Sequence, residues 1–176
     1  MNFEPQADLS ETLRAAFRRH ASGVAVITTT DAEGAPVGFT ATSMTSLGSN
    51  PPLVTFNVAR GSSSWQAISQ ASHFAVHTLG ANNLELARRM AADRTLRFIG
   101  NDWGMMEPGV PVFEAATAVL IGKTREIHPI ENNAIVVIEI IDGGVANSDE
   151  ACSTTNEDIS RRAQNSISRG AVLRFL

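Results

Sequence analysis

Residues 60–64 read Arg-Gly-Ser-Ser-Ser and bring together the groups that bind a phosphate. The arginine offers a fork of charged donors, the glycine lets the backbone approach closely, and the serines add hydroxyl and N–H donors. A helix that begins at Ser64 or Trp65 would add the positive end of its dipole. Since neither a P-loop nor a dinucleotide fingerprint is present, the segment predicts another kind of phosphate-bearing cofactor site. The competing interpretation is a polar loop between a strand and a helix.

Two apolar, β-prone runs precede this segment and carry small hydroxyl side chains. They span residues 38–47 and 53–58 and are joined through a turn at Pro51-Pro52. Threonine is common on the outer face of strands, so the hydroxyls of the first run also fit an ordinary exposed strand. Both interpretations place two neighbouring strands directly before residues 60–64.

Other reactive residues in the chain are scattered. The four histidines show no metal-ligand spacing, and the single Cys152 excludes an intramolecular disulfide and a cysteine-built metal site. His77 lies within a strand-like run and reads as a hydrogen-bonded core histidine. Arg88 and Arg89 indicate either a solvated helix face or a contact with a cofactor phosphate or a dimer mate. No metal site is therefore predicted.

Composition fits one globular domain of 176 residues, with 43% hydrophobic and 18% charged residues. A net charge of −4, with no tyrosine and 6% aromatic residues, argues against nucleic acid as a partner. No apolar run approaches the roughly 18 residues of a membrane span, and no signal peptide is visible. We therefore expect a cytoplasmic protein that binds neither nucleic acid nor a membrane.

Hydrophobic periodicity predicts helices and strands in an order typical of an antiparallel sheet. Residues 93–113, rich in glycine and proline, are expected to be irregular, and the core spans residues 8–147, followed by a divergent tail over 148–176. In the tail a helix is expected at 159–167 and an apolar end at 171–176. The predicted helices span 9–21 with Asp8 as the cap, 64–71, and a segment from Asn82 or Asn83 to 91; the predicted strands span 24–30, 37–47, 53–58, 73–79, 115–127 and 134–146.

An open sheet of six strands in a small domain leaves two unpaired edges, and closure into a barrel removes them. The strands are joined by hairpin-like links, which favour antiparallel pairing. The predicted fold is therefore mainly β with peripheral helices, a six-stranded antiparallel barrel in a single domain over residues 1–176.

In this order, several segments resemble the short-chain flavin reductase family, whose members adopt the FMN-binding split barrel. The resemblance runs from Phe17 to about Val145, which is most of the chain. The pair Arg97-Phe98 is similar to a basic–Phe pair in the family's flavin-side loop. The other segments are 17–29 (opening helix and strand), 38–46 with 51–54 (ring-binding segment), 60–64 (phosphate segment), 73–79 and 86–91.

The resemblance implies a homodimer with FMN or FAD at the subunit boundary and NADH or NADPH as co-substrate. Family members pass a hydride from nicotinamide to flavin and commonly serve a partner monooxygenase, so no catalytic side chain is implied. Residues 40–43 would lie along the flavin ring through backbone N–H groups, and 57–59 near the ring and ribityl chain. The implied cofactor-binding residues are Thr40, Ala41, Thr42, Ser43, Asn57, Val58, Ala59, Arg60, Ser62, Ser63, Ser64 and Phe98.

One turn departs from the family pattern. Where members often carry Gly-Asp-His beside the nicotinamide, this chain reads Glu131-Asn132-Asn133, and His128 lies five residues before Asn133. His128 is either a solvated turn residue or a nicotinamide contact, and Asn133 takes the place of the histidine. Two hypotheses follow: an NAD(P)H-dependent flavin reductase, or a flavin-binding carrier, sensor or electron-transfer module without turnover. A dimeric barrel that binds another phosphate compound is a third.

Overall fold

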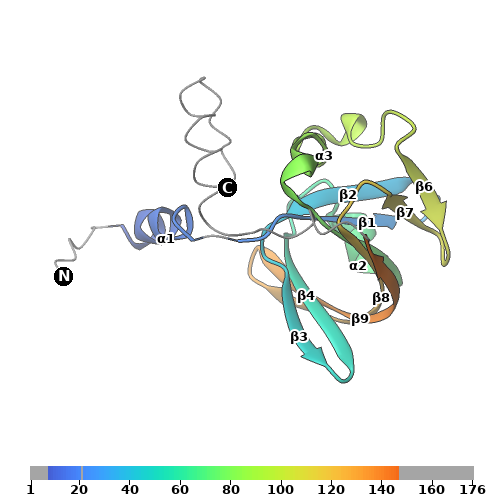
Figure 1. The fold of residues 1–176 in the computed structure, drawn as a ribbon. Coiled ribbons are helices and arrows are strands. Elements are labelled where there is room, and N and C mark those ends of the chain that lie inside the picture. The colour runs from blue at the N-terminus through green and yellow to red at the C-terminus, as the bar shows by residue number, and fades with distance from the viewer. Residues whose placement is uncertain (1–7, 21, 147–176) are drawn as a thin grey trace.

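The computed structural model describes residues 8–20 and 22–146, which form curved antiparallel sheets with a few helices outside them (Figure 1). The predicted mainly β fold with peripheral helices is confirmed. Short 3-10 turns span Ala81–Asn83 and Arg94–Leu96. The helices and strands are α1 (Leu9–Phe17), β1 (Ala25–Thr30), β2 (Pro36–Ala41), β3 (Thr45–Ser49), β4 (Pro52–Ala59), α2 (Trp65–Gln70), β5 (His73–Thr78), α3 (Leu84–Ala91), β6 (Trp103–Met106), β7 (Val110–Phe113), β8 (Ala118–Ile130) and β9 (Asn133–Val145).

Seven strands pair in the order β2-β1-β5-β8-β9-β4-β3, and β6 pairs with β7 in a separate hairpin. The large sheet curves round so that β2 and β4 contact each other. The rings of Phe39 on β2 and Phe56 on β4 lie 6.0 Å apart across this approach. Among the described residues no ladder joins the two strands, so the barrel is split between β2 and β4.

The sheet has one strand more than predicted because the expected strand 37–47 is broken. Residues 42–44 leave β2 at one end of the sheet and enter β3 at the other. There the Ser43 hydroxyl accepts a hydrogen bond from the Asn57 N–H at 3.0 Å, in place of a backbone ladder bond. This crossing carries the chain over the split.

The segment 93–113 also contains the β6–β7 hairpin, which composition did not predict. Its turn carries Pro108 and Gly109, and Gly109 has a φ of 103° that favours glycine. All four residues of β7 are buried, including Phe113, which is fully buried. The hairpin therefore forms because β7 packs on the barrel, although its glycines and prolines disfavour strands.

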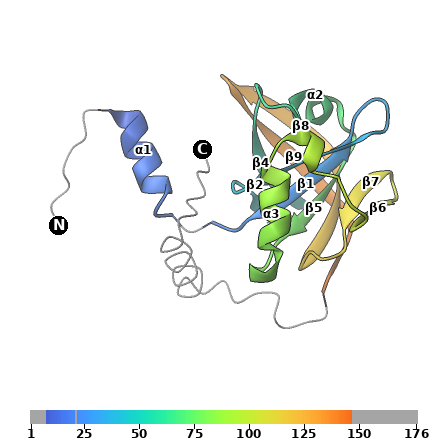
Figure 2. The same ribbon diagram turned by 90° about the horizontal axis from the view of Figure 1, so that it is seen from above.

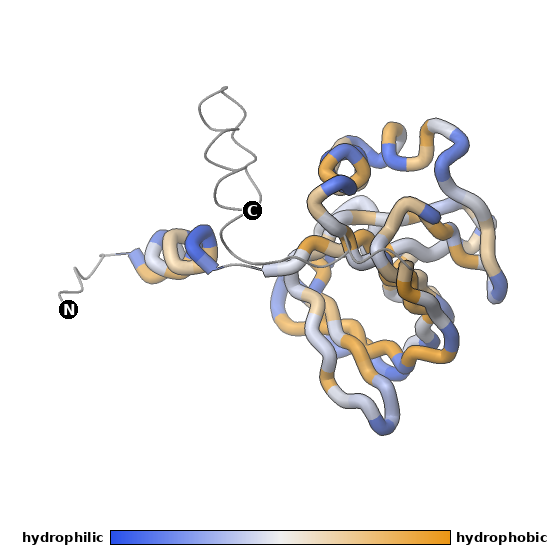
Figure 3. The backbone as a smooth tube through the Cα atoms, viewed as in Figure 1, coloured by the Kyte–Doolittle hydropathy of each residue, from blue (hydrophilic) through white to orange (hydrophobic). Residues whose placement is uncertain are grey.

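The barrel interior is filled by aliphatic and phenylalanine side chains from β1, β4, β5 and β9. Ile27, Phe56, Phe74 and Val136 are all 0% exposed, and the rings of Phe56 and Phe74 meet edge to face at 5.4 Å. Burying each such side chain stabilises the fold by about 1.5–3 kcal/mol. Hydrophobic residues are concentrated in the strands and hydrophilic ones at several turns (Figure 3).

Helix α3 packs closely on β2 at Gly38, where a larger residue would force its neighbours to shift. A Cβ at Gly38 would lie 2.6 Å from Met90 Cε and 3.0 Å from the Ile27 carbonyl oxygen. Nearby, the Thr40 hydroxyl donates to the Ala87 carbonyl at 2.8 Å. The last turn of α3 and the loop after it are thereby held against one edge of the split.

Helix α1 begins as predicted, because the Asp8 carboxylate accepts from the Ser10 N–H at 2.8 Å. It ends at Phe17 rather than at residue 21, and it projects away from the barrel (Figures 1 and 2). None of its nine residues is buried, and Leu9, Leu13 and Phe17 form an exposed apolar stripe.

Among the described helices, none has the length and apolar character needed to cross a membrane. Two predictions lie outside the described residues: the helix at 159–167 and the apolar end at 171–176.

Candidate functional site

A groove of about 720 Å³ lies at the split of the barrel and is lined from both of its edges. It collects eleven of the residues that the sequence predicted as binding residues, from segments far apart in the chain. Its lining includes two arginines and no carboxylate, although the chain as a whole is acidic. The predicted residues that line it are Thr40, Ala41, Thr42, Ser43, Asn57, Val58, Ala59, Ser62, Ser63, Ser64 and Asn133; the others are Phe39, Arg88, Met90, Ala91, Ala92 and Arg97.

One wall is the segment that crosses from β2 to β3. The Thr40 hydroxyl donates to the Ala87 carbonyl, and the Ser43 hydroxyl accepts from the Asn57 N–H and donates to the Asn57 carbonyl at 3.5 Å. Thr42 and Ser43 lie outside both strands, and no described residue accepts from their backbone N–H groups. This wall therefore offers a ligand backbone donors rather than these two hydroxyls.

The opposite wall is the end of β4, next to the start of β9. In the antiparallel register Ala59 pairs with Asn133 and Val58 pairs with Ala134. Asn133 is exposed beside Ala59, while Val58 is buried. The pairing of two strands thus brings a carboxamide to the groove from a position 74 residues further along the chain than Ala59.

The serine turn after β4 closes one end of the groove. Ser62 and Ser63 are exposed, whereas Ser64 is only 2% exposed. Ser64 precedes α2 but makes no capping bond with its side chain. Its Oγ instead accepts a hydrogen bond from Arg97 Nη1 at 3.1 Å.

Arg60 is not brought into the groove with the serines that follow it. Its Nη1 donates to the Glu131 carbonyl at 2.9 Å, and its guanidinium lies 5.8 Å from the centre of the Trp65 ring. The backbone N–H of Arg60 also donates to the Asn132 carbonyl at 2.8 Å. In this chain Arg60 ties the β8–β9 turn to the end of β4.

Arg97 lines the groove but was not among the predicted binding residues. It is partly buried, and burial lowers the pKa of its guanidinium, which stays charged. Arg88, the second groove arginine, pairs with Glu85 at 3.1 Å. The sequence signal for Arg97 was its place before Phe98. That pairing alone did not say which of the two side chains reaches a ligand.

Phe98, which was predicted to flank a flavin, packs beneath the loop instead of lining the groove. Its ring stacks on Phe113 at 5.7 Å and meets Trp103 edge to face at 5.2 Å. The Trp103 indole N–H donates to the Phe98 carbonyl at 3.0 Å. These contacts fix the loop that carries Arg97.

The described donors and charges thus suit an elongated anion with an apolar part, which Phe39, Val58 and Met90 would contact. Residues 17–157 match the model of the flavin reductase like domain. The chain belongs to this family.

Relatives and solved structures agree with this assignment. The chain is 38% identical over 125 residues, 70% of its length, to the NADH:FMN oxidoreductase of Rhodococcus erythropolis, of which the match spans 65%. It is 32% identical over 117 residues, 66% of its length, to the reductase subunit HsaB of a flavin-dependent monooxygenase of Mycobacterium tuberculosis, and covers 62% of that subunit. A solved flavin reductase domain protein from Arthrobacter sp. FB24 is 46% identical, with a TM-score of 0.76, covering 80% of this chain and 87% of that one.

Two histidines of this flavin reductase like domain are not among the residues that line the groove. His128 is exposed on β8 and its Nε2 lies 2.7 Å from the Glu126 carboxylate. His77 is fully buried; its Nε2 accepts from the Phe113 N–H at 3.1 Å, so Nδ1 carries the proton and donates to the Val26 carbonyl at 3.0 Å. Burial lowers the pKa of His77 to about 4. The predicted role of His77 as a hydrogen-bonded core residue is confirmed.

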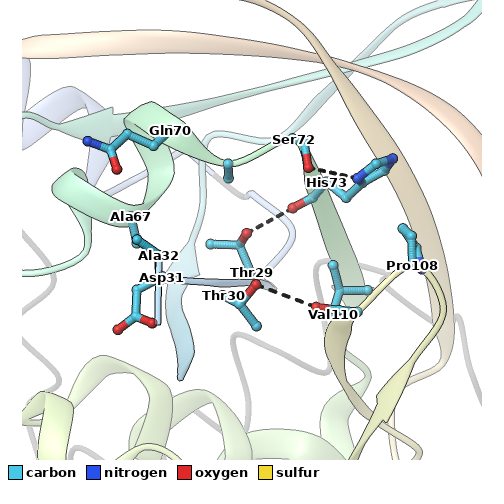
Figure 4. Close-up of a pocket in the computed structure, with 12 residues that line it drawn as sticks. Thr29, Thr30, Asp31, Ala32, Ala67, Gln70, Ser72, His73, Pro108 and Val110 are labelled. Carbon is cyan, nitrogen blue, oxygen red and sulfur yellow. Dashed lines mark hydrogen bonds between the residues drawn. The ribbon is translucent and has the colours of Figure 1, made fainter. Parts of the chain in front are cut away.

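A second, smaller pocket of about 210 Å³ lies between the β1–β2 turn, the end of α2 and the β6–β7 turn (Figure 4). Some of its polar groups bond to one another: the Thr29 hydroxyl donates to the His73 carbonyl at 2.8 Å, and Ser72 Oγ lies 2.9 Å from His73 Nδ1. It contains none of the predicted binding residues. The described residues hold no cluster of three or more potential metal ligands.

Proposed function

We propose that this chain is an NAD(P)H-dependent flavin reductase that binds FMN or FAD in the groove at the split of the barrel. The observation that carries the proposal is the groove lining: eleven predicted residues, two arginines and no carboxylate. The Rhodococcus and Mycobacterium relatives, whose names state NADH, FMN and a monooxygenase reductase subunit, support it.

Different groove residues would contact the ring and the phosphate of a bound flavin. A bound flavin would supply the redox chemistry, by accepting a hydride from a nicotinamide. The free N–H groups of Thr42 and Ser43 would orient the polar edge of the ring, and Val58 would contact its apolar part. The hydroxyls of Ser62 and Ser63 would donate to the phosphate.

Catalytic bleaching of flavin tests this function. Purified protein is mixed anaerobically with a large excess of FMN and with NADH or NADPH, and the flavin absorbance is followed. We expect bleaching of many equivalents of FMN per protein. Absence of bleaching with both nicotinamides would refute the reductase.

A flavin-binding module without turnover is the second candidate, because Asn133 lines the groove where many family members carry a histidine. Bleaching limited to one equivalent, together with tight FMN binding, would favour it. Asn133→His is the sharper test: it should restore turnover in a module that lacks it and change a working reductase little.

We also propose that the chain acts as a homodimer and as one flavin-binding domain with its core at residues 8–147. The exposed stripe of Leu9, Leu13 and Phe17 supports an intermolecular contact for α1. Light scattering of the wild type should give twice the chain mass, and Leu13→Glu should weaken the dimer. A monomeric wild type would refute this proposal.

Supply of reduced flavin to a separate monooxygenase is the partner function we propose, and a cytoplasmic location stays a prediction from composition. Release of the reduced flavin is the property that this role needs. Reduction of excess FMN by catalytic amounts of protein would demonstrate this release. Reduced flavin that stays bound to the protein would contradict the proposed partner function.

A further inference from the structure

The turn between β8 and β9 has a strained backbone. Ile130 pairs with Asn133 across the hairpin, so Glu131 and Asn132 alone form the turn. Glu131 has a φ of 49°, and among the described residues it is the only one besides glycines with a positive φ. The first central position of such a turn favours glycine, because a Cβ is disfavoured there. Contacts from outside the turn are therefore needed to keep this conformation.

Arg60 supplies such contacts from the end of β4. Its Nη1 donates to the Glu131 carbonyl at 2.9 Å, and its backbone N–H donates to the Asn132 carbonyl at 2.8 Å. One residue thus bonds to the carbonyls of both turn residues. The Glu131 carboxylate is not involved, since no ion pair of Arg60 is found among the described residues.

The Arg60 side chain is itself held in place by an aromatic ring. Its guanidinium lies 5.8 Å from the centre of the Trp65 ring, and Trp65 packs against the barrel core. A cation is attracted to the face of an indole. The contact between Arg60 and Trp65 therefore connects the strained turn to the core.

The residue after this turn lines the groove. Asn133 begins β9 and pairs with Ala59, the neighbour of Arg60 in the chain. Because the conformation of a hairpin turn fixes the register of its strands, a change in the turn would move Asn133. Arg60 therefore influences a groove wall although it does not line the groove itself.

The carboxamide of Asn133 offers two N–H donors and a carbonyl acceptor. A nicotinamide carries a carboxamide with the same groups, so the two amides can pair through two hydrogen bonds. The backbone donors of Thr42 and Ser43, which we assign to the flavin ring, lie on the opposite wall. A hydride donor must be aligned with the flavin, which gives the position of Asn133 a direct consequence for the reaction.

We propose that Arg60 is a positioning residue. It stabilises the strained turn at Glu131 and Asn132, and so holds the Asn133 carboxamide where it binds the nicotinamide of the hydride donor. This inference rests on the proposed function, because nicotinamide is the co-substrate of the proposed reductase.

Hydrogen exchange of the ligand-free protein tests the support of the turn. The wild type, Arg60→Gln, Glu131→Gly and the double variant are compared over residues 130–134. We expect Arg60→Gln to speed exchange there about 5- to 10-fold. Glycine relieves the strain, so in the Glu131→Gly background Arg60→Gln should change exchange less than about twofold. Equal effects in both backgrounds would overturn the inference. If Arg60→Gln does not fold, faster exchange in Glu131→Gly alone would contradict the strain.

Steady-state kinetics test the consequence for the groove. The KM for the nicotinamide that the protein oxidises and the Kd of FMN are measured for each variant. Arg60→Gln and Asn133→Ala should each raise this KM about 3- to 10-fold and change the Kd of FMN less than about twofold. Arg60→Lys should keep part of the wild-type value, and Glu131→Gly should rescue Arg60→Gln. Arg125→Gln, on the same hairpin, is the matched control and should leave both constants unchanged.

The double variant of Arg60→Gln with Asn133→Ala shows whether the arginine acts through the asparagine. Its KM should equal that of Asn133→Ala alone, and additive effects would overturn the inference. A weaker affinity for FMN with an unchanged nicotinamide KM would also overturn it. A wild type that reduces no flavin would refute the proposed function, and the exchange measurement, which needs no ligand, would still decide the role of Arg60 in the turn.

Discussion

The turn after β4 and the loop after α3 each carry an arginine near the groove, and the two guanidinium groups are used differently. Arg60 bonds to the Glu131 carbonyl and lies against the Trp65 ring, outside the groove. Arg97 lines the groove, is partly buried and has only neutral acceptors. The difference teaches that burial and hydrogen-bond partners, rather than position in a phosphate-like motif, decide which cation is available to an anion.

The largest effect we expect is a loss of folding stability in acid, caused by His77, which lies beneath the Arg97 loop. His77 bonds to the backbone of Phe113, whose ring stacks on Phe98. Its pKa is about 4 in the fold against 6.5 ordinarily, so the unfolded chain binds the extra proton as pH falls below 6.5. The free energy of unfolding should therefore drop by about 3 kcal/mol between pH 6.5 and pH 4.

Urea unfolding at several pH values measures this loss. His77→Gln should be less stable than the wild type at pH 7, but its stability should fall less steeply between pH 6.5 and pH 4. An unchanged slope in His77→Gln would show that another group binds the proton.

Matched glycine substitutions compare the packing under α3 with the turn that carries Arg60. A Cβ at Gly38, under α3, would meet Met90 Cε at 2.6 Å, whereas a Cβ at Gly61, beside Arg60, has nothing within 4 Å. Gly38→Ala should destabilise the fold by about 1–3 kcal/mol, and Gly61→Ala should change stability by less than about 0.5 kcal/mol. Thermal unfolding of both variants measures the difference, and equal losses would contradict the packing argument.

Asp102→Asn should have a smaller effect, confined to the Arg97 side. Asp102 pairs with Arg89 of α3 and so ties the loop to the helix. The pair is partly exposed, so we expect FMN affinity to fall only about two- to fivefold. Arg125→Gln, which breaks an ion pair with Glu139 on the β8–β9 hairpin, is the control and should leave FMN affinity unchanged.

Arg60→Gln should have a structural effect confined to the β8–β9 turn. Its exposed bond to the Glu131 carbonyl contributes about 0.5–1.5 kcal/mol. Faster hydrogen exchange in the β8–β9 turn, with little change in global stability, is the expected result. A large global loss would mean that the turn contributes to the core.

Much of the fold followed from the alternation and β-branched content of individual segments. The long strands β8 and β9 and the capped start of α1 were predicted because their signals are local. The break at residues 42–44 was not, since it depends on a bond between Ser43 and Asn57, 14 residues away. The β6–β7 hairpin was also missed, because burial of β7 overrides its proline.

The candidate site was also predicted only in part. Residues 40–43, 57–59 and 62–64 were predicted by resemblance and line one groove, together with Asn133. Arg60 and Phe98 came from the same matched segments, but they lie against Trp65 and Phe113 instead. The direction of a side chain depends on tertiary packing, which a sequence motif does not specify. For the same reason the sequence did not predict that Arg97 lines the groove.

The split in the barrel has a consequence for how the protein is assayed. At one end of the sheet order β2 approaches β4, the strand next to the other end, and no ladder between the two exists among the described residues; the groove draws its lining from both strands. A molecule bound there would contact both strands across the split, so the melting temperature should rise with occupancy of the groove. At a hundred times its dissociation constant it adds about 2.7 kcal/mol, and a thermal-shift screen would rank candidate ligands before any activity is known.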